Sequence, residues 1–170
     1  MKSLIRLIAV QFVLVSCCFA ETGTVTFYSA GFPFKDQFKT AVTLKGIIPF
    51  SGWVFDGGQV LAHAEAGHFM TFHIPTGSHS FSVSYNRKHP GKTALIQLDI
   101  ESGHNYCVRL SAKYANYVFV PVSNVNALID QVDCRTAFHE AGDLKPLEIK
   151  RIENSSQTML DTSNKFPNTD

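Results

Sequence analysis

The stretch VFDGGQVLAHAEAGHFMTFHIPTGSHSFSVSY, residues 54–85, decides the fold because it alternates apolar and polar side chains between turn signals. Such alternation is typical of β-strands that bury one face. The run DGG at 56–58 can adopt the positive φ angles that a tight hairpin requires. Pro75 lacks an N–H donor and Gly77 permits a turn, so a strand ends there. The predicted inward-facing side chains are Met70, Phe72, Ile74, Phe81, Val83 and Tyr85.

The same alternation extends to both sides of this stretch. Further predicted strands are TVTFYSA (24–30), ALIQLDI (94–100), YCVRLSA (106–112) and YVFVPVS (117–123). Their inward-facing residues are Val25, Phe27, Ala94, Ile96, Leu98, Ile100, Tyr106, Val108 and Leu110, which places Cys107 and Arg109 on the opposite face. Many short strands of this kind predict an all-β fold, a single antiparallel β-sandwich over residues 22–152.

The spacing of apolar residues changes from alternating to helical in NALIDQVDCRTAFHEAG, residues 126–142. This change predicts one short helix that ends at Gly142. The apolar face of that helix is formed by Leu128, Val132 and Phe138. PLEIKRI (146–152) follows as a last short strand. Residues 153–170 are polar and lack periodicity, so they are predicted to form a disordered tail.

The composition fits one packed domain without a charged partner. The 170 residues are 45% hydrophobic and 17% charged, with a formal net charge of +1. Such a balance gives no strong basic field for nucleic acid. No run of lysine and arginine forms a polybasic patch for a membrane surface.

Residues 1–20 are predicted to be a signal peptide. Lys2 and Arg6 give a positive start, and the apolar segment 7–16 that follows is too short to span a bilayer comfortably. Removing this segment leaves 13 basic and 14 acidic side chains, so the mature chain is nearly neutral. We therefore expect export to the periplasm.

Two processing routes compete at the end of this segment. A general signal peptidase could cleave after Ala20. Alternatively LVSC, Leu14 to Cys17, resembles a bacterial lipobox, in which Cys17 becomes the lipidated first residue. An uncleaved N-terminal anchor is the third alternative.

Cys107 and Cys134 are the two cysteines of the predicted domain. In an oxidising compartment an even cysteine count favours a disulfide over two buried free thiols. Closing the loop between them would contribute about 3 kcal/mol by loop entropy.

The histidines of residues 63–79 raise the question of a metal site. If residues 66–67 formed a two-residue hairpin loop, His63, Glu65 and His68 would share one face and could chelate an ion. A bulge would dissolve this trio, and a histidine at a sheet margin is the commoner outcome. We therefore predict no metal and no cofactor.

Catalytic groupings are equally sparse. The chain has no G-x-S-x-G elbow and no phosphate-binding Walker loop. Asp56 fits turn chemistry, and Asp130 and Asp133 fit a solvated helix face. A nucleophilic Cys107 would need a free thiolate, which the expected disulfide removes. The sequence thus predicts a protein that is not an enzyme.

The turns of this chain resemble those of small extracytoplasmic β-sandwich domains of the PEGA type. They are closer still to a bacterial family of unknown function in which D-G-x-x-V-A, G-x-Y/F, P-P-G-x-H and G-x-x-Y-Y-V-R follow one another. The corresponding residues are Asp56, Gly57, Val60 and Leu61, then Gly67 and Phe69, then Pro75, Gly77 and His79, then Gly103, Tyr106, Val108 and Arg109. The chain departs from the pattern at Leu61, where a small residue is usual, and at Thr76, which replaces the second proline. The similarity extends over about residues 22–152 and includes the ending EAG…KPLEIKRI.

The resemblance implies an exported sandwich of the immunoglobulin, transthyretin or PEGA kind with no assigned activity, because its motifs are turns and strand starts. His79 is expected to form a hydrogen bond to nearby backbone and to fix the chain where it leaves the turn at residues 75–79. The expected function is a membrane-tethered interaction or structural module of the envelope with an unknown protein partner. The alternative is a small-ligand or metal-binding periplasmic protein that uses the His63, Glu65 and His68 hairpin.

Overall fold

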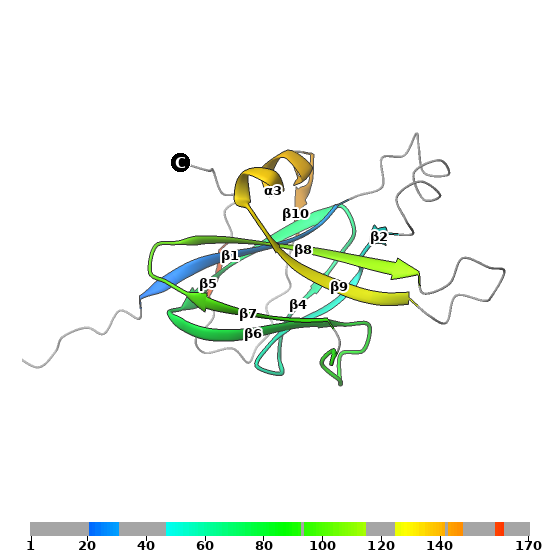
Figure 1. Cartoon of the computed structure of the whole chain (residues 1–170), viewed down its shortest axis with the longest axis horizontal. Helices are drawn as coiled ribbons and strands as arrows, with labels where there is room; N and C mark the ends of the chain where they lie inside the picture. Colours follow the sequence, from blue (N-terminus) through cyan, green and yellow to red (C-terminus); the bar gives the residue numbers. More distant parts are fainter. Residues whose placement is uncertain are drawn as a thin grey trace, which may run out of the picture.

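In the computed structural model the chain forms two β-sheets that face each other, with a short helix, α3 (Cys134–Ala141), outside them (Figure 1). The structure describes residues 21–30, 47–92, 94–114, 125–141, 143–147 and 159–161. None of the helices in these ranges is long and apolar enough to cross a membrane. The predicted signal peptide (1–20) and the predicted strand at 117–123 lie outside the described residues.

The larger sheet has β1 at its centre, between β5 and β8. Its strands are β1 (Thr22–Ser29), β2 (Ile47–Pro49), β5 (His68–Pro75), β8 (Asn105–Tyr114), β9 (Val125–Val132), β10 (Lys145–Pro146) and β11 (Met159–Asp161). β10 and β11 pair with successive parts of β5, and β1 and β2 pair with successive parts of β8. β9 pairs with β8 along most of its length.

The smaller sheet has the order β4-β3-β6-β7, and every pair in it is antiparallel. Its strands are β3 (Gly52–Asp56), β4 (Gln59–Ala64), β6 (Gly77–Ser84) and β7 (Leu95–Ile100). The predicted DGG hairpin is confirmed, since Asp56 pairs with Gln59 across Gly57 (φ 55°) and Gly58 (φ 89°). Positive φ at both central residues is what a two-residue hairpin turn needs.

The core lies between the two sheets and confirms most of the predicted inward faces. The fully buried Phe27 presents its ring edge-on to Phe72 and Phe81, with ring centroids 6.1 and 5.3 Å apart. The other predicted core residues in this cluster are Val25, Met70, Ile74, Val83, Ala94, Leu98, Ile100, Val108 and Leu110. Tyr85 is the exception, because β6 ends at Ser84 and the Tyr85 side chain is 51% exposed.

The expectation of a wholly antiparallel sandwich is wrong. β1 and β8 run parallel, with Thr24 opposite Asn105 and Tyr28 opposite Arg109, and β10 runs parallel to β5. Parallel neighbours need a long connection, and the whole smaller sheet lies between β1 and β8 in the chain.

The predicted helix begins later than expected. Leu128 and Val132 belong to β9, opposite Ser111 and Cys107 of β8, so they share no helical face with Phe138, which is 44% exposed. α3 starts after Asp133, whose Oδ1 accepts hydrogen bonds from the backbone N–H groups of the next turn, 2.9 Å from Arg135 N and 3.3 Å from Thr136 N. The aspartate is therefore an N-cap of the helix.

The predicted tail is also corrected in part. Met159–Asp161 form β11, antiparallel to β5, with Met159 opposite His73. β10 covers only His68 and Phe69 of β5, so the next part of that edge can pair with another segment. Pairing through backbone groups requires no apolar period, and the alternation of side chains therefore did not indicate β11. The rest of the predicted tail, and the predicted strand beyond residue 147, lie outside the described residues.

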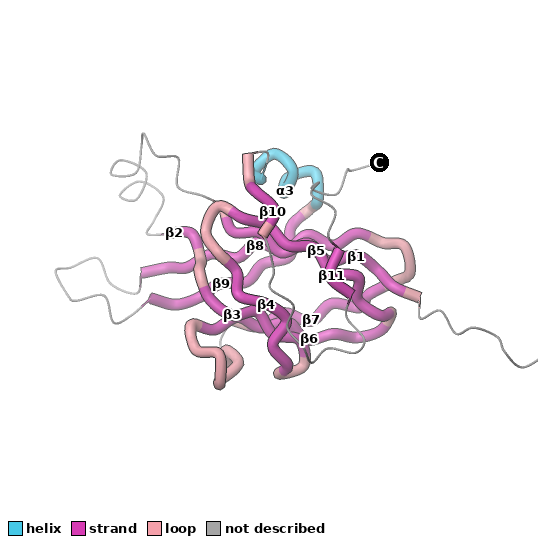
Figure 2. Tube along the Cα trace, turned by 180° about the vertical axis from the view of Figure 1, so that it is seen from behind, coloured by secondary structure: helices cyan, strands magenta, loops and turns pink. Residues whose placement is uncertain are grey.

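Helix α3 covers the face of the larger sheet that points away from the core (Figure 2). Ala137 and Ala141 are buried there against Tyr28, Phe69 and Cys107. This second cluster confirms that Cys107 and Val108 point to opposite faces of β8. The part of the larger sheet beneath α3 is therefore buried on both faces.

Candidate functional site

An open cleft of about 440 Å³ lies on the outer face of the smaller sheet. Ser80 and Ser82 of β6 form its floor. The β3–β4 turn at 57–58 borders it, as do residues 89–92 of the β6–β7 loop and Leu95 at the start of β7. This volume falls in the range of about 300–1,000 Å³ that is typical of small-molecule sites.

The β6–β7 loop is shaped by local hydrogen bonds near its start and by a close approach to β6 near its end. Near its start, Lys88 N donates a hydrogen bond to Asn86 Oδ1 (2.9 Å) and His89 N donates to Asn86 O (3.3 Å). Near its end, a Cβ added at Gly91 would lie 2.0 Å from the Val83 carbonyl oxygen. Only glycine lets the loop approach β6 so closely, so Gly91 positions the cleft wall against that strand.

The cleft carries a local positive charge on a nearly neutral protein. The loop segment 86–92 holds Arg87, Lys88 and Lys92 together with His89, and it contains no acidic residue. Lys92 and His89 line the cleft directly, and none of the described lining residues is acidic. The site is thus suited to a ligand that carries negative charge.

The only tryptophan of the chain, Trp53, lies on the same face of the sheet. It pairs with Ser84, two residues after Ser82, so its side chain points outward like those of the cleft floor. The Arg87 guanidinium lies 5.1 Å from the centroid of the Trp53 ring. The His63 ring lies edge-on to the Trp53 ring, and their centroids are 4.8 Å apart. The cleft loop and the indole are therefore in direct contact.

The hairpin of His63, Glu65 and His68 on which the metal-binding alternative depends does not form. β4 and β5 belong to different sheets, and residues 65–67 carry the chain from one sheet to the other. His63 pairs with Trp53, and His68 pairs with Ser29 of β1. No group of three histidine, cysteine, aspartate or glutamate side chains within the described ranges is arranged to hold a metal ion.

His79 bonds to nearby backbone, as expected, and also to a side chain that the sequence did not suggest. Its Nε2 lies 2.9 Å from Pro75 O, and its Nδ1 lies 2.8 Å from Asp56 Oδ2. The imidazole stacks on Phe81 with an interplanar angle of 12°. A carbonyl and a carboxylate can only accept, so both bonds form together when both ring nitrogens carry protons. His79 thereby ties the β3–β4 turn to the crossing between β5 and β6.

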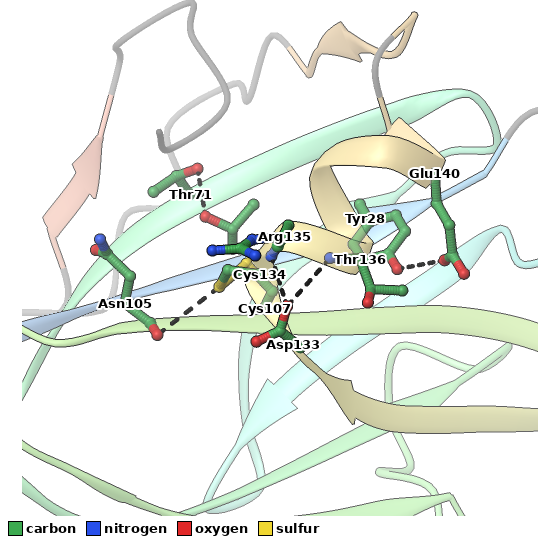
Figure 3. The surroundings of a disulfide bond; sticks show 10 residues. Tyr28, Thr71, Asn105, Cys107, Asp133, Cys134, Arg135, Thr136 and Glu140 are labelled. Carbon is green, nitrogen blue, oxygen red and sulfur yellow. Dashed lines mark hydrogen bonds between the residues drawn. A yellow bond between two sulfur atoms is a disulfide. The ribbon is translucent and has the colours of Figure 1, made fainter. Parts of the chain in front are cut away.

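Cys107 and Cys134 form a disulfide that joins β8 to the first residue of α3, as the cysteine count predicts (Figure 3). Their Cα atoms are 5.2 Å apart, and the bond closes a sequence separation of 27. Cys107 is fully buried beneath the helix. The predicted lipidation residue, Cys17, lies outside the described residues.

A charged network fastens the other end of α3. Tyr28 Oη donates a 2.6 Å hydrogen bond to Glu140 Oε2 (Figure 3), and Arg109 Nη1 donates a 3.0 Å bond to Glu140 Oε1. Arg109 also lies 3.9 Å from Asp130 of β9. Burial raises the pKa of the Tyr28 phenol far above its ordinary value of 10.0, and the bond to Glu140 raises that pKa further.

We expect Tyr28→Phe to weaken the dependence of stability on alkaline pH. The unfolded chain releases the phenol proton near the ordinary pKa of 10.0, whereas the folded protein keeps it to higher pH. The contribution of the Tyr28 phenol to the stability of the wild type is therefore fully present below the unfolded-state pKa of 10.0, and it is lost as the pH rises above that value. The loss approaches about 1.4 kcal/mol per pH unit for this proton, which urea unfolding between about pH 8 and pH 11 measures.

Tyr85→Phe is the matched control for this prediction. Its ring is 51% exposed, so this variant is expected to keep the alkaline loss of the wild type. Equal losses in Tyr28→Phe and wild type would contradict the role assigned to Tyr28.

No family model, no curated protein and no solved structure matches the chain.

Sequence reasoning missed the cleft because its residues come from three separate segments. Ser80 and Ser82 occur in the sequence as the polar half of an alternating strand. The segment 86–92 was recognisable only as a polar loop. The four basic side chains of this segment, with no acidic residue among them, were the signal in the sequence that could have indicated a binding site there.

Proposed function

We propose that this chain is a non-catalytic binding module of the bacterial envelope. In this proposal the signal peptide exports it, lipid on Cys17 tethers it to a membrane, and the cleft presents a ligand site to the periplasm. The Cys107–Cys134 disulfide supports export, because such bonds persist in oxidising compartments.

The observation that carries the proposal is the position of the cleft relative to the start of the domain. β1 begins at Thr22, where a tether from Cys17 would join. The start of β1 and the loop between β6 and β7 lie toward opposite ends of the molecule in both views (Figures 1 and 2). A domain held by its first strand would therefore direct the cleft away from the membrane.

The finer fold class is part of the same proposal. We place the domain with the PEGA-type sandwiches, because the turns that carry the resemblance stand at strand junctions. Asp56 and Gly57 open the turn between β3 and β4, and Pro75 and Gly77 flank the crossing from β5 to β6. His79 links these two turns through its bonds to Asp56 and Pro75.

Cys17→Ser tests the tether, and Cys18→Ser is its matched control. When the full chain is expressed in a bacterium, the wild type and Cys18→Ser are expected in the membrane fraction. Their intact masses should show a chain that starts at Cys17 and carries acyl groups, with the two-hydrogen deficit of one disulfide. Cys17→Ser is expected to lose the lipid. An unmodified wild-type chain that starts at Glu21 would overturn the tether.

A further inference from the structure

We propose that the cleft on the outer face of the smaller sheet binds a sugar phosphate. The inference rests on the proposed binding function and names the chemical class of its ligand.

The anionic part of the ligand follows from the charges of the cleft. Lys92 and His89 line it from the loop, and Arg87 and Lys88 lie in the same segment. Among the described lining residues no carboxylate opposes them. A lysine ammonium that contacts phosphate forms a charge-assisted hydrogen bond, which is stronger than a neutral one.

The sugar part follows from the size and the remaining lining of the cleft. A volume of about 440 Å³ leaves room for more than a bare phosphate ion. Ser80, which is partly exposed, offers a hydroxyl group that can donate to and accept from sugar hydroxyls, whereas Ser82 beside it is only 3% exposed. Leu95, which is 50% exposed, and Pro90 give an apolar surface against which a sugar ring can pack.

Trp53 provides a built-in reporter for this site. It is the single tryptophan of the chain, and Arg87 of the cleft loop stacks over its ring. A ligand that draws the loop toward negative charge should change the surroundings of the indole. Intrinsic fluorescence therefore reports binding without a label.

The experiment titrates the purified protein with glucose 1-phosphate, inorganic phosphate and glucose, by tryptophan fluorescence and by calorimetry. We expect glucose 1-phosphate to bind most tightly, inorganic phosphate more weakly, and glucose at least about tenfold more weakly than the sugar phosphate. Raising the ionic strength from about 0.05 M to about 0.5 M should weaken the binding of both anions.

Lys92→Ala and Lys88→Ala form a matched pair of variants. Both replace a lysine of the same exposed loop, but only Lys92 lines the cleft. Lys92→Ala should weaken glucose 1-phosphate binding about tenfold or more, whereas Lys88→Ala should stay within about threefold of wild type. Both variants should keep the wild-type unfolding temperature, which shows that the fold is intact.

The outcomes separate this inference from the proposed function. Equal binding of glucose and glucose 1-phosphate overturns the sugar phosphate and leaves a binding module for a neutral ligand. Equal affinities of the two lysine variants for glucose 1-phosphate overturn its placement in the cleft beside Lys92. Binding of inorganic phosphate as tight as that of the sugar phosphate overturns the sugar part. If none of the three compounds binds, the inference falls while the lipid on Cys17 can still be found.

Discussion

Removing the disulfide, with Cys107→Ala and Cys134→Ser together, is expected to lower the free energy of unfolding by about 3 kcal/mol. The bond closes a separation of 27 residues, and without it the unfolded chain regains the entropy of that loop. Alanine suits position 107 because that side chain is fully buried, and serine suits the partly exposed position 134. Urea unfolding of the variant and the oxidised wild type measures the difference.

A reducing agent gives the internal control. It should lower the stability of the wild type by a similar amount and leave that of the double variant unchanged. A double variant as stable as the oxidised protein would mean that the second cluster under α3 holds the helix without the bond. In that case the contacts of Ala137 and Ala141, and not the disulfide, would fasten α3 to the sheet.

His79→Gln is expected to lower the free energy of unfolding by about 2 kcal/mol, because it breaks a partly buried, charge-assisted hydrogen bond. The His79 and Asp56 side chains are only 18% and 16% exposed, so water replaces the lost partner poorly. A glutamine amide cannot span Asp56 Oδ2 and Pro75 O at once in the geometry of the two ring nitrogens. Thermal and urea unfolding of the variant measure the effect.

His104→Gln is the control for this second prediction. The imidazole of His104 is 63% exposed and lies 3.6 Å from Glu101, so its loss should change stability by less than about 0.5 kcal/mol. Asp56→Asn and the double variant complete a cycle that isolates the coupling between His79 and Asp56. A coupling near zero, or a His79→Gln variant with the unfolding temperature of the wild type, would refute the linking role of His79.

The strands could be predicted because burial of one face imposes a period of two. Met70, Phe72 and Ile74 were therefore placed in the core correctly from the alternation alone. The hairpin at 57–58 was equally accessible, since its two glycines meet a local requirement on φ. These features depend on neighbours in the sequence, and local chemistry determines them.

The choice of partner strands could not be predicted in this way. Residues 65–67 are short enough for a hairpin loop, and alternation is the same whether β5 turns back on β4 or crosses to the other sheet. The parallel pair of β1 and β8 joins segments far apart in the sequence. Leu128 and Val132 fit a helical period as well as a strand, and only the pairing of β9 with β8 decides between them.

The candidate site also combines features that the local sequence predicts with features that depend on how distant segments meet. The bond from His79 to backbone was expected from its place in a turn, but its bond to Asp56 depends on two sequence segments meeting in space. The alternative trio of His63, Glu65 and His68 does not form, because it required β4 and β5 to pair as a hairpin and these strands belong to different sheets. The cleft depends on how three segments converge on one sheet face. No pattern in the linear sequence predicts that convergence.

The central position of β1 also determines when the domain can be completed during synthesis. This strand precedes both of its neighbours in the chain, which are β5 and the early part of β8, up to Arg109. It can pair with β5 as soon as that strand has been made, but its parallel pairing with β8 waits until residues 105–109 follow. All four strands of the smaller sheet come before β8 in the chain, so the larger sheet is the last of the two to be completed during synthesis.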